Sequence, residues 1–157
     1  NILDLGCGSG RDSLEFIKRG YNITAVDGSK ELSIAASKVI GQEVICNKFE
    51  DLQLTEKFHG IWACASLLHI NKRDLINVIK NISSNLEDNG VFYMSFKYGK
   101  GEYIDEKGRY FNCYIEKTFK EMILAVPKLE IIKIYKSEDT IGGRNNLQWL
   151  NVLLKIN

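Results

Sequence analysis

The sequence lacks several features that would assign it to a specialised class of protein. No apolar run approaches the roughly 20 residues that span a bilayer, and no signal peptide is visible. The formal net charge of the 157 residues is only +1. A protein that lives on bulk nucleic acid is expected to carry a strongly basic face, so this charge weighs against one. The length suffices for one domain with a sizeable core.

Cysteine, proline and histidine are also scarce. The four cysteines are scattered and form no C-x-x-C pair, which argues against a zinc site and against a disulfide framework. Reduced thiols in a cytosolic protein are the simplest interpretation, so we expect a cytoplasmic protein that holds no metal. The only proline, Pro127, is expected to end a helix.

Strand and helix patterns alternate along the chain. This alternation predicts an α/β fold, in which a doubly wound, mostly parallel sheet of seven strands is covered on both faces. No helix pattern separates the last two strands, so they should form a C-terminal antiparallel hairpin. One domain over 1–157 is expected, with a long polar and aromatic loop over 97–115. The expected strands are 2–5, 22–26, 43–46, 60–64, 91–96, 129–136 and 147–155, and the expected helices are 11–19, 30–40, 72–86 and 116–126.

The most informative segment is Asp4-Leu5-Gly6-Cys7-Gly8-Ser9-Gly10, which joins the first expected strand to the first expected helix. Glycines at alternate positions let a ligand approach the backbone, and N–H groups at the helix start would face it. A turn that cradles a pyrophosphate reads G-x-G-x-x-G, whereas here the spacing is G-x-G-x-G. The Asp4 carboxylate would repel a pyrophosphate but attract the ammonium and sulfonium of S-adenosylmethionine. A turn that only reverses the chain is the alternative.

A second carboxylate lies at a consistent distance along the chain. Asp27 ends the second expected strand, 21 positions after Gly6. A carboxylate at such a place can accept hydrogen bonds from both hydroxyls of a ribose. Gly28 follows it, and Ser29 is a candidate N-cap for the next helix. Alone, Asp27 would be an ordinary turn acid, but together with the glycine motif it predicts a nucleoside site.

The glycine motif and the Arg11-Asp12-Ser13-Leu14 segment after it resemble the class I S-adenosylmethionine-dependent methyltransferases. The front third is most similar to their tellurite-resistance and small-molecule branch. The resemblance covers roughly 1–96 well and the rest only in topology. It implies a Rossmann-like fold, the cofactor S-adenosyl-L-methionine, and methyl transfer by in-line displacement. Family members often carry an N-terminal helix over the ligand. Because Asn1 directly precedes the first expected strand, we expect such a segment to be missing from this numbering.

The resemblance also implies roles for further residues. An acid after the third strand meets the adenine amino group, and Asp51 matches it best, with Glu50 second. The segment after the fourth strand lies beside the methionine moiety, and an arginine at the position of Arg11 can pair with the methionine carboxylate. The implied cofactor-binding residues are Asp4, Gly6, Cys7, Gly8, Gly10, Arg11, Asp27, Gly28, Ser29, Glu50, Asp51, Leu52, Ala63, Cys64 and Ala65.

The acceptor side of the site is less defined. His69 is a candidate general base, because imidazole is a side chain commonly used for that role, although a structural histidine is the alternative and many such enzymes need no catalytic side chain. Cys64 is not in the Pro-Cys pattern of cytosine-C5 enzymes, so a wall residue is the simpler interpretation. Candidates to contact a flat or anionic acceptor are Tyr98, Arg109, Tyr110 and Arg144, and for both arginines surface solvation is the alternative.

Several functions remain open at this point. The near-neutral charge favours a small-molecule methyl acceptor over nucleic acid, but methylation of RNA or of a protein side chain is an alternative. A non-catalytic module that binds S-adenosylmethionine is another, opposed by the intact glycines, Asp4 and Asp27. A nicotinamide-binding domain is opposed by Asp4, by the glycine spacing and by the closing hairpin. The sequence does not define the oligomeric state.

Overall fold

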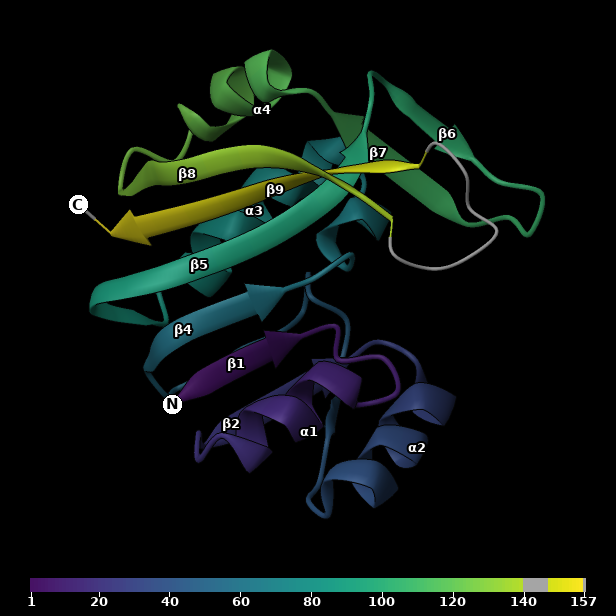
Figure 1. Ribbon diagram of the computed structural model, residues 1–157, viewed down its shortest axis with the longest axis vertical. Coiled ribbons are helices and arrows are strands. Elements are labelled where there is room, and N and C mark those ends of the chain that lie inside the picture. The colour runs from purple at the N-terminus through teal and green to yellow at the C-terminus, as the bar shows by residue number, and fades with distance from the viewer. Residues whose placement is uncertain (140–146, 157) are drawn as a thin grey trace.

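Strands and helices alternate through the first half of the chain, and strands dominate the second half. The computed structural model describes residues 1–139 and 147–156, and Figure 1 shows their arrangement. The elements are β1 (Ile2–Leu5), α1 (Arg11–Lys18), β2 (Ile23–Asp27), α2 (Lys30–Ile40), β3 (Ile45–Cys46), β4 (Phe58–Ala63), the 3-10 turn η1 (Leu67–His69), α3 (Lys72–Ser83), β5 (Leu86–Tyr98), β6 (Glu102–Ile104), β7 (Tyr110–Tyr114), α4 (Glu116–Ile123), β8 (Leu129–Glu138) and β9 (Gln148–Ile156).

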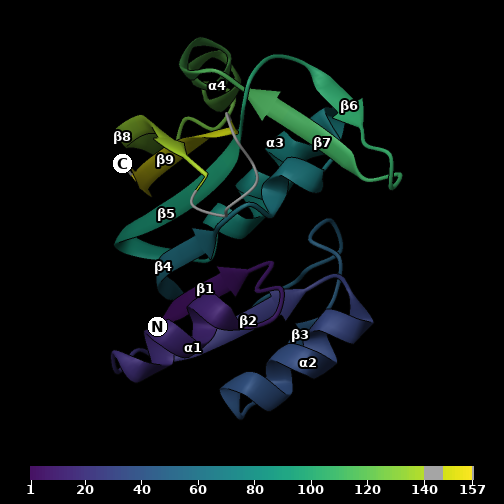
Figure 2. The ribbon, with the colours of Figure 1, turned by 45° about the vertical axis from the view of Figure 1, so that its right-hand side comes forward.

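The predicted α/β fold with a mostly parallel sheet is confirmed. Strands β3, β2, β1, β4 and β5 are parallel neighbours in that order. The two last strands form the expected antiparallel hairpin, in which β9 pairs with both β5 and β8. Helices α1 and α2 lie on one face of the sheet and α3 lies on the other (Figures 1 and 2). The strand order reverses between β1 and β4, and ligands bind beyond the carboxyl ends of strands at such a switch point.

Two apolar clusters hold the helices against the sheet. The larger lies under α3 and α4 and includes Leu3 and Leu5 of β1. The smaller lies under α1 and α2 and includes Ala25 and Ala36. Successive side chains of a strand point to opposite faces, so Asp4, between the two leucines, points to the α1 face. The sequence therefore buries a carboxylate where the smaller cluster meets the end of the strand.

The expected loop over 97–115 was a wrong prediction, because this segment forms the β6–β7 hairpin. Lys97 of β5 pairs in register with Cys113 of β7 and also with Trp149 of β9. Strand β4 stops opposite Met94, so β7 continues along the edge of β5 that β4 leaves. The sheet consequently has nine strands, not seven, among the described residues.

Element boundaries also differ from the expectation. Helix α3 ends at Ser83 and not at residue 86, because Asn85 turns its side chain to the carbonyls of Leu54 and Glu56. Helix α4 ends at Ile123, ahead of the expected 126. Strand β5 begins at Leu86 and not at the expected residue 91, and Asn89 and Gly90 lie within an irregularity of the β4–β5 pairing. In the part of the chain that the structure describes, no helix combines the length and apolar character that a membrane crossing requires.

Candidate functional site

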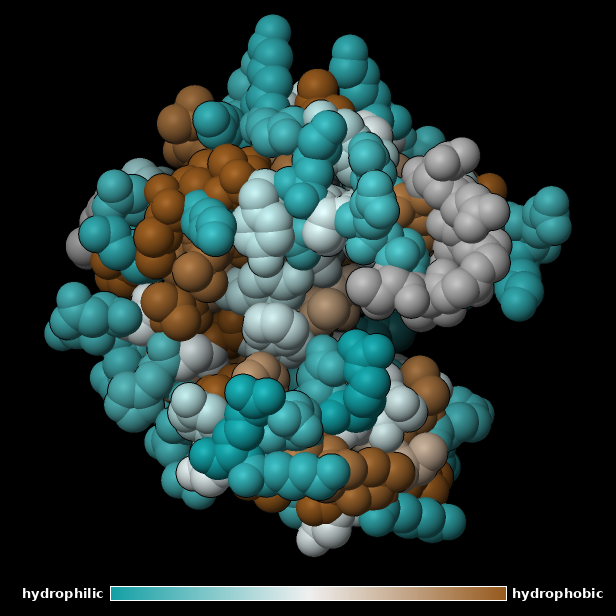
Figure 3. All heavy atoms as spheres, in the orientation of Figure 1, coloured by the Kyte–Doolittle hydropathy of each residue, from teal (hydrophilic) through white to brown (hydrophobic). Residues whose placement is uncertain are grey.

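A cavity of about 480 Å³ opens at the carboxyl ends of β1, β2 and β4, which is a volume typical of small-molecule sites. It lies at the switch point of the sheet. In Figure 3 the surface is hollowed between the half that carries α1 and α2 and the half that carries the β6–β7 hairpin. The lining residues are Gly6, Gly8, Asp27, Gly28, Leu32, Lys48, Phe49, Glu50, Ala65, Ser66, His69 and Ile70.

The three glycines of the motif serve different purposes. A Cβ on Gly6 would lie 2.3 Å from the Cβ of Ser66, and one on Gly10 would lie 3.1 Å from the side chain of Ile40. These two glycines therefore let the turn pack against the loop after β4 and against α2. Gly8, at φ +57°, has no atom within 4 Å of a Cβ placed on it and lines the cavity. Gly8 is the position at which a ligand gains from the missing side chain.

Asp27 ties the glycine turn to the start of α2. Its carboxylate accepts hydrogen bonds from the N–H of Gly8 at 2.8 Å and from the N–H of Ser29 at 2.9 Å. Ser29 caps α2 as predicted, because its Oγ accepts a hydrogen bond from the N–H of Leu32. Each carboxylate oxygen of Asp27 has a second lone pair that can accept from a ligand hydroxyl. The structure therefore places Asp27 where its predicted contact with a ribose is possible.

Asp4 lies behind the glycine turn and does not line the cavity. Its side chain is 2% exposed and accepts a hydrogen bond from Ser13 Oγ at 2.5 Å. Burial raises the pKa of Asp4 from 3.8 to about 6, and the carboxylates of Asp12 and Asp27 add to this effect. A buried carboxylate of this kind is stabilised in its charged form by a nearby cation.

The acids after β3 are separated by the fold. Phe49 and Glu50 line the cavity, whereas Asp51 is exposed and lies outside the lining. Leu52 is 2% exposed and belongs to the larger core. The structure therefore brings Glu50, the second choice of the sequence analysis, to the cavity. The cause is the short turn in which the N–H groups of Asp51 and Leu52 bond the carbonyls of Lys48 and Phe49.

The residues after β4 also divide between two surfaces. Ala65, at φ 51°, lines the cavity and donates its N–H to Ser95 Oγ at 2.8 Å. Ser66 lines the cavity too, and its hydroxyl donates to the carbonyl of Leu5 at 2.6 Å. Ala63 is buried in the sheet. Burial raises the pKa of Cys64, which keeps its thiol protonated and agrees with a wall residue.

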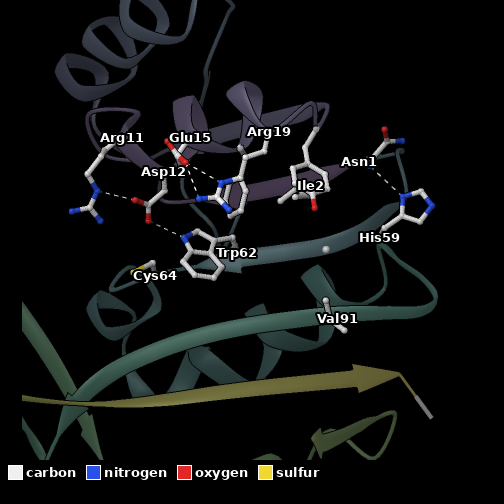
Figure 4. A pocket seen from close by; sticks show the side chains of 13 residues that line it. Asn1, Ile2, Arg11, Asp12, Glu15, Arg19, His59, Trp62, Cys64 and Val91 are labelled. Carbon is white, nitrogen blue, oxygen red and sulfur yellow. Dashed lines mark hydrogen bonds and ion pairs between the residues drawn. The ribbon is translucent and has the colours of Figure 1, made fainter. Parts of the chain in front are cut away.

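Arg11 and Cys64 line a different groove, on the α1 face of the sheet. This groove has a volume of about 730 Å³. Figure 4 shows the Asp12 carboxylate between Arg11 and Trp62, which it bonds at 2.8 Å and 2.9 Å. The structure thus does not bring Arg11 to the cofactor cavity. Cys7 is buried beneath α1 and α2, and burial raises the pKa of its thiol to about 12.

His69 lies at the edge of the cavity in a defined orientation. Its Nδ1 lies 2.8 Å from the carbonyl oxygen of Tyr110. Because a carbonyl only accepts hydrogen bonds, Nδ1 carries the proton in the neutral ring and Nε2 carries the lone pair. The ring of Phe111 packs against the imidazole at 4.7 Å between centroids. The β6–β7 hairpin therefore fixes both the tautomer and the position of His69.

Tyr98, Arg109 and Tyr110, three of the four residues predicted to contact an acceptor, do not line the cavity. The Tyr98 hydroxyl donates to Glu116 on α4 at 2.8 Å, and Arg109 donates two hydrogen bonds to Asp105 at 2.8 and 2.6 Å. The Tyr110 hydroxyl donates to Glu102 at 2.5 Å. These side chains hold the hairpin and its neighbours together. Arg144 lies outside the described residues.

Some lining residues were missed by the sequence analysis. Lys48 and Ile70 have no distinguishing pattern around them, and Leu32 is one of several apolar residues that recur along the expected helix 30–40. Ser66 carried a signal that could have been used, since Gly6 needs a small neighbour. The general reason is that a lining residue on a loop is defined by the loop's path, which the local sequence does not specify.

The comparisons with known proteins agree with this geometry. Residues 2–90 match the family Methyltransf_25, described as a methyltransferase domain. The match covers more than half of the chain, so this chain belongs to that family. The prediction of a class I methyltransferase fold with S-adenosylmethionine as its cofactor is confirmed at the level of the family.

Individual curated proteins also resemble the chain in sequence. The chain is 32% identical over 107 residues to YqeM of Bacillus subtilis (strain 168), whose name assigns it provisionally as a methyltransferase; the match covers 61% of this chain and 43% of YqeM. The chain spans about half the length of the curated relatives it matches.

Two solved structures have the same fold. An S-adenosylmethionine-dependent methyltransferase of Methanosarcina mazei matches with a TM-score of 0.84 at 18% identity, covering 99% of this chain and 91% of that one. The second is the 1,6-didemethyltoxoflavin-N1-methyltransferase of Burkholderia thailandensis, solved with 1,6-didemethyltoxoflavin and S-adenosylhomocysteine bound. It matches with a TM-score of 0.80 at 21% identity, covering 99% of this chain and 70% of that one.

Proposed function

We propose that the protein is an S-adenosylmethionine-dependent methyltransferase that transfers a methyl group by in-line displacement to a small molecule, in the cytoplasm. The observation that carries this proposal is the cavity at the switch point, in which the open Gly8 lies beside the Asp27 carboxylate. The Burkholderia thailandensis neighbour, which was solved with 1,6-didemethyltoxoflavin bound, supports the substrate class. The four free cysteines are consistent with a reducing compartment.

The residues present fit this cofactor. Asp27 would hold the ribose hydroxyls, and Phe49 and Glu50 would border the adenine. Gly8 leaves the backbone accessible, and the buried Asp4 carboxylate behind the turn supplies negative charge. When bound, S-adenosylmethionine supplies a methyl group that is activated by a positively charged sulfur. The protein needs mainly to align the acceptor with it, and alignment can supply about 7–11 kcal/mol.

His69 is placed to act as the general base for an acceptor that arrives protonated. Its Nδ1–H is held by the Tyr110 carbonyl, so Nε2 keeps the lone pair that receives a proton. A neutral imidazole at the rim of the cavity can accept this proton as the acceptor's nucleophilic atom is methylated. The residue is thus proposed as catalytic, and the hairpin as the element that orients it.

Binding measurements test the cofactor assignment. Calorimetry should show S-adenosylmethionine and S-adenosylhomocysteine binding with dissociation constants on the order of micromolar, and NAD should not bind. Asp27→Ala and Gly8→Val should each abolish binding, because one removes the ribose acceptor and the other fills the open position. Asp88→Ala, at an exposed position near the start of β5, is the matched control. Retained binding in both variants would show that the pocket is misplaced.

Transfer measurements test the rest of the proposal. Acceptor pools incubated with cofactor that carries a labelled methyl group should yield a labelled small molecule. Labelled RNA or protein would support the macromolecular alternative, and binding without any transfer would support a non-catalytic module. His69→Asn keeps a donor for the Tyr110 carbonyl but removes the base. We expect it to lower kcat by about 100-fold or more with unchanged cofactor affinity. An unchanged kcat would exclude the base.

A further inference from the structure

We propose that Lys97 binds an anionic group, a carboxylate or a phosphate, on the methyl acceptor. This proposal rests on the proposed function, because it assigns the substrate class of the same site. Lys97 lies near the carboxyl end of β5, at the edge where ligands of parallel sheets bind. It was not among the acceptor residues that the sequence suggested, and Arg109, which was, is engaged by Asp105.

Among the residues that the structure describes, neutral groups hold the ammonium of Lys97. Its Nζ donates to the Tyr103 hydroxyl at 2.6 Å. It lies 3.6 Å from the ring centroid of Phe111 and 5.2 Å from that of Tyr103. Among residues 1–139 and 147–156, no carboxylate pairs with it, and residues 140–146 contain no acid. The charge of Lys97 is therefore fixed in place by rings and a hydroxyl but is not neutralised.

The position of Lys97 relative to the cavity follows from the strand. Ser95 and Lys97 are two residues apart on β5 and so point to the same face. Ser95 Oγ accepts the N–H of Ala65, which lines the cavity. Phe111 packs against the imidazole of His69 on the one hand and against the Lys97 ammonium on the other. Lys97 thus lies two residues further along β5 than Ser95, just beyond the cavity and on the side where His69 is held.

An anion on the acceptor would complete this arrangement. A lysine that makes a charge-assisted hydrogen bond to a carboxylate or phosphate binds it more strongly than a neutral donor does. The ring of Tyr103, 42% exposed, offers an apolar surface beside that anion. The alternative is that Lys97 only ties the β6–β7 hairpin to β5. The two roles differ in one respect, since only the first makes the protein prefer an anionic ligand over a neutral one.

The experiment uses the protein saturated with S-adenosylhomocysteine and three simple probes. Benzoate carries a carboxylate, phenyl phosphate carries a phosphate, and benzamide is the neutral counterpart of benzoate. Calorimetry should show at least one anionic probe binding about tenfold or more tightly than benzamide, and the tighter anion identifies the group. Lys97→Gln should remove this preference and Lys97→Arg should keep it. Lys100→Gln, on the exposed turn before β6, is the matched control.

The outcomes separate this proposal from the cofactor assignment. If benzamide binds as well as both anions, or if Lys97→Gln keeps the preference, the anion site is wrong while S-adenosylhomocysteine binding still stands. If S-adenosylhomocysteine does not bind at all, the proposed function fails and this proposal fails with it. Should Lys97→Gln not fold, the preference of the unmodified protein among the three probes decides by itself.

Discussion

The two halves of the site are built in opposite ways. The proposed cofactor half uses mainly backbone and glycine, at the turn after β1, the end of β2 and the turn after β3. The proposed acceptor half uses side chains from η1, β5 and the β6–β7 hairpin. Substitution of a few side chains should therefore change the ligand preference of the acceptor half more readily than that of the cofactor half.

The two halves also differ in charge. The buried carboxylates of Asp4 and Asp27 surround the glycine turn, whereas the unpaired ammonium of Lys97 lies across the edge of the sheet. A cationic methyl donor suits the first half and an anionic acceptor suits the second. The comparison predicts that substitutions in the cofactor half act on stability and donor binding, and that those in the acceptor half act on the acceptor alone.

The largest effect is expected at Gly6. An alanine Cβ there would lie 2.3 Å from the Cβ of Ser66 at φ +83°, so the turn must move. We expect Gly6→Ala to lower the free energy of unfolding by about 3–5 kcal/mol, from backbone strain together with overpacking. Urea denaturation measures it. Gly20→Ala, at φ +89° with nothing within 4 Å, carries the strain alone and should cost about 1 kcal/mol. Equal losses in both variants would remove the packing role of Gly6.

A smaller, pH-dependent effect is expected at Asp4. Its pKa in the folded protein is raised from 3.8 to about 6. The stability associated with Asp4 is therefore fully present below pH 3.8 and is lost as the pH rises through about 6. Above pH 6 the ionised form should cost at most about 3 kcal/mol. Asp4→Asn should then be more stable than the unmodified protein at pH 8, with little difference at pH 4, while binding S-adenosylmethionine more weakly.

Ser13→Ala sharpens the test at Asp4. The Ser13 hydroxyl stabilises the charged carboxylate, so its removal should raise the pKa of Asp4 further. The fall in stability, which begins near pH 3.8, should therefore extend to a higher pH in this variant. Thermal unfolding followed from pH 4 to pH 8 measures both effects. If Asp4→Asn loses stability equally at every pH, burial does not penalise the charge of Asp4.

The smallest effect is expected at Asn112, in the acceptor half. Its Nδ2 donates to the Ile70 carbonyl at 3.1 Å, and its Oδ1 has no partner among the described residues. Asn112→Ala should cost about 1 kcal/mol, since one hydrogen bond is lost but an unsatisfied oxygen is removed. Hydrogen exchange should quicken in the β6–β7 hairpin, and S-adenosylhomocysteine affinity should be unchanged. Asn22→Ala, at the opposite end of the sheet, is the control; weaker cofactor binding in Asn112→Ala alone would couple the two halves.

The sequence predicted the first half of the molecule well, because its signals are local. Asp27, Gly28 and the Ser29 cap follow directly from strand, turn and helix chemistry. The β6–β7 hairpin was missed, because its two strands are short and are set by pairing with one another and, for β7, with β5. Arg109 was a plausible ligand for an anion until Asp105, four residues earlier, was seen to hold it. Partners of this kind depend on how the chain turns, which residue types alone do not specify.

The attachment of β7 has a consequence for how such enzymes diversify. Only two register pairs join β7 to β5, namely Lys97 with Cys113 and Tyr98 with Tyr114. The segment between Tyr98 and Cys113 therefore leaves the sheet and rejoins it at the same place. Residues 99–112 thus form a cassette. Exchanging it for the matching stretch of another family member should change the proposed acceptor preference and leave the binding of S-adenosylmethionine unchanged.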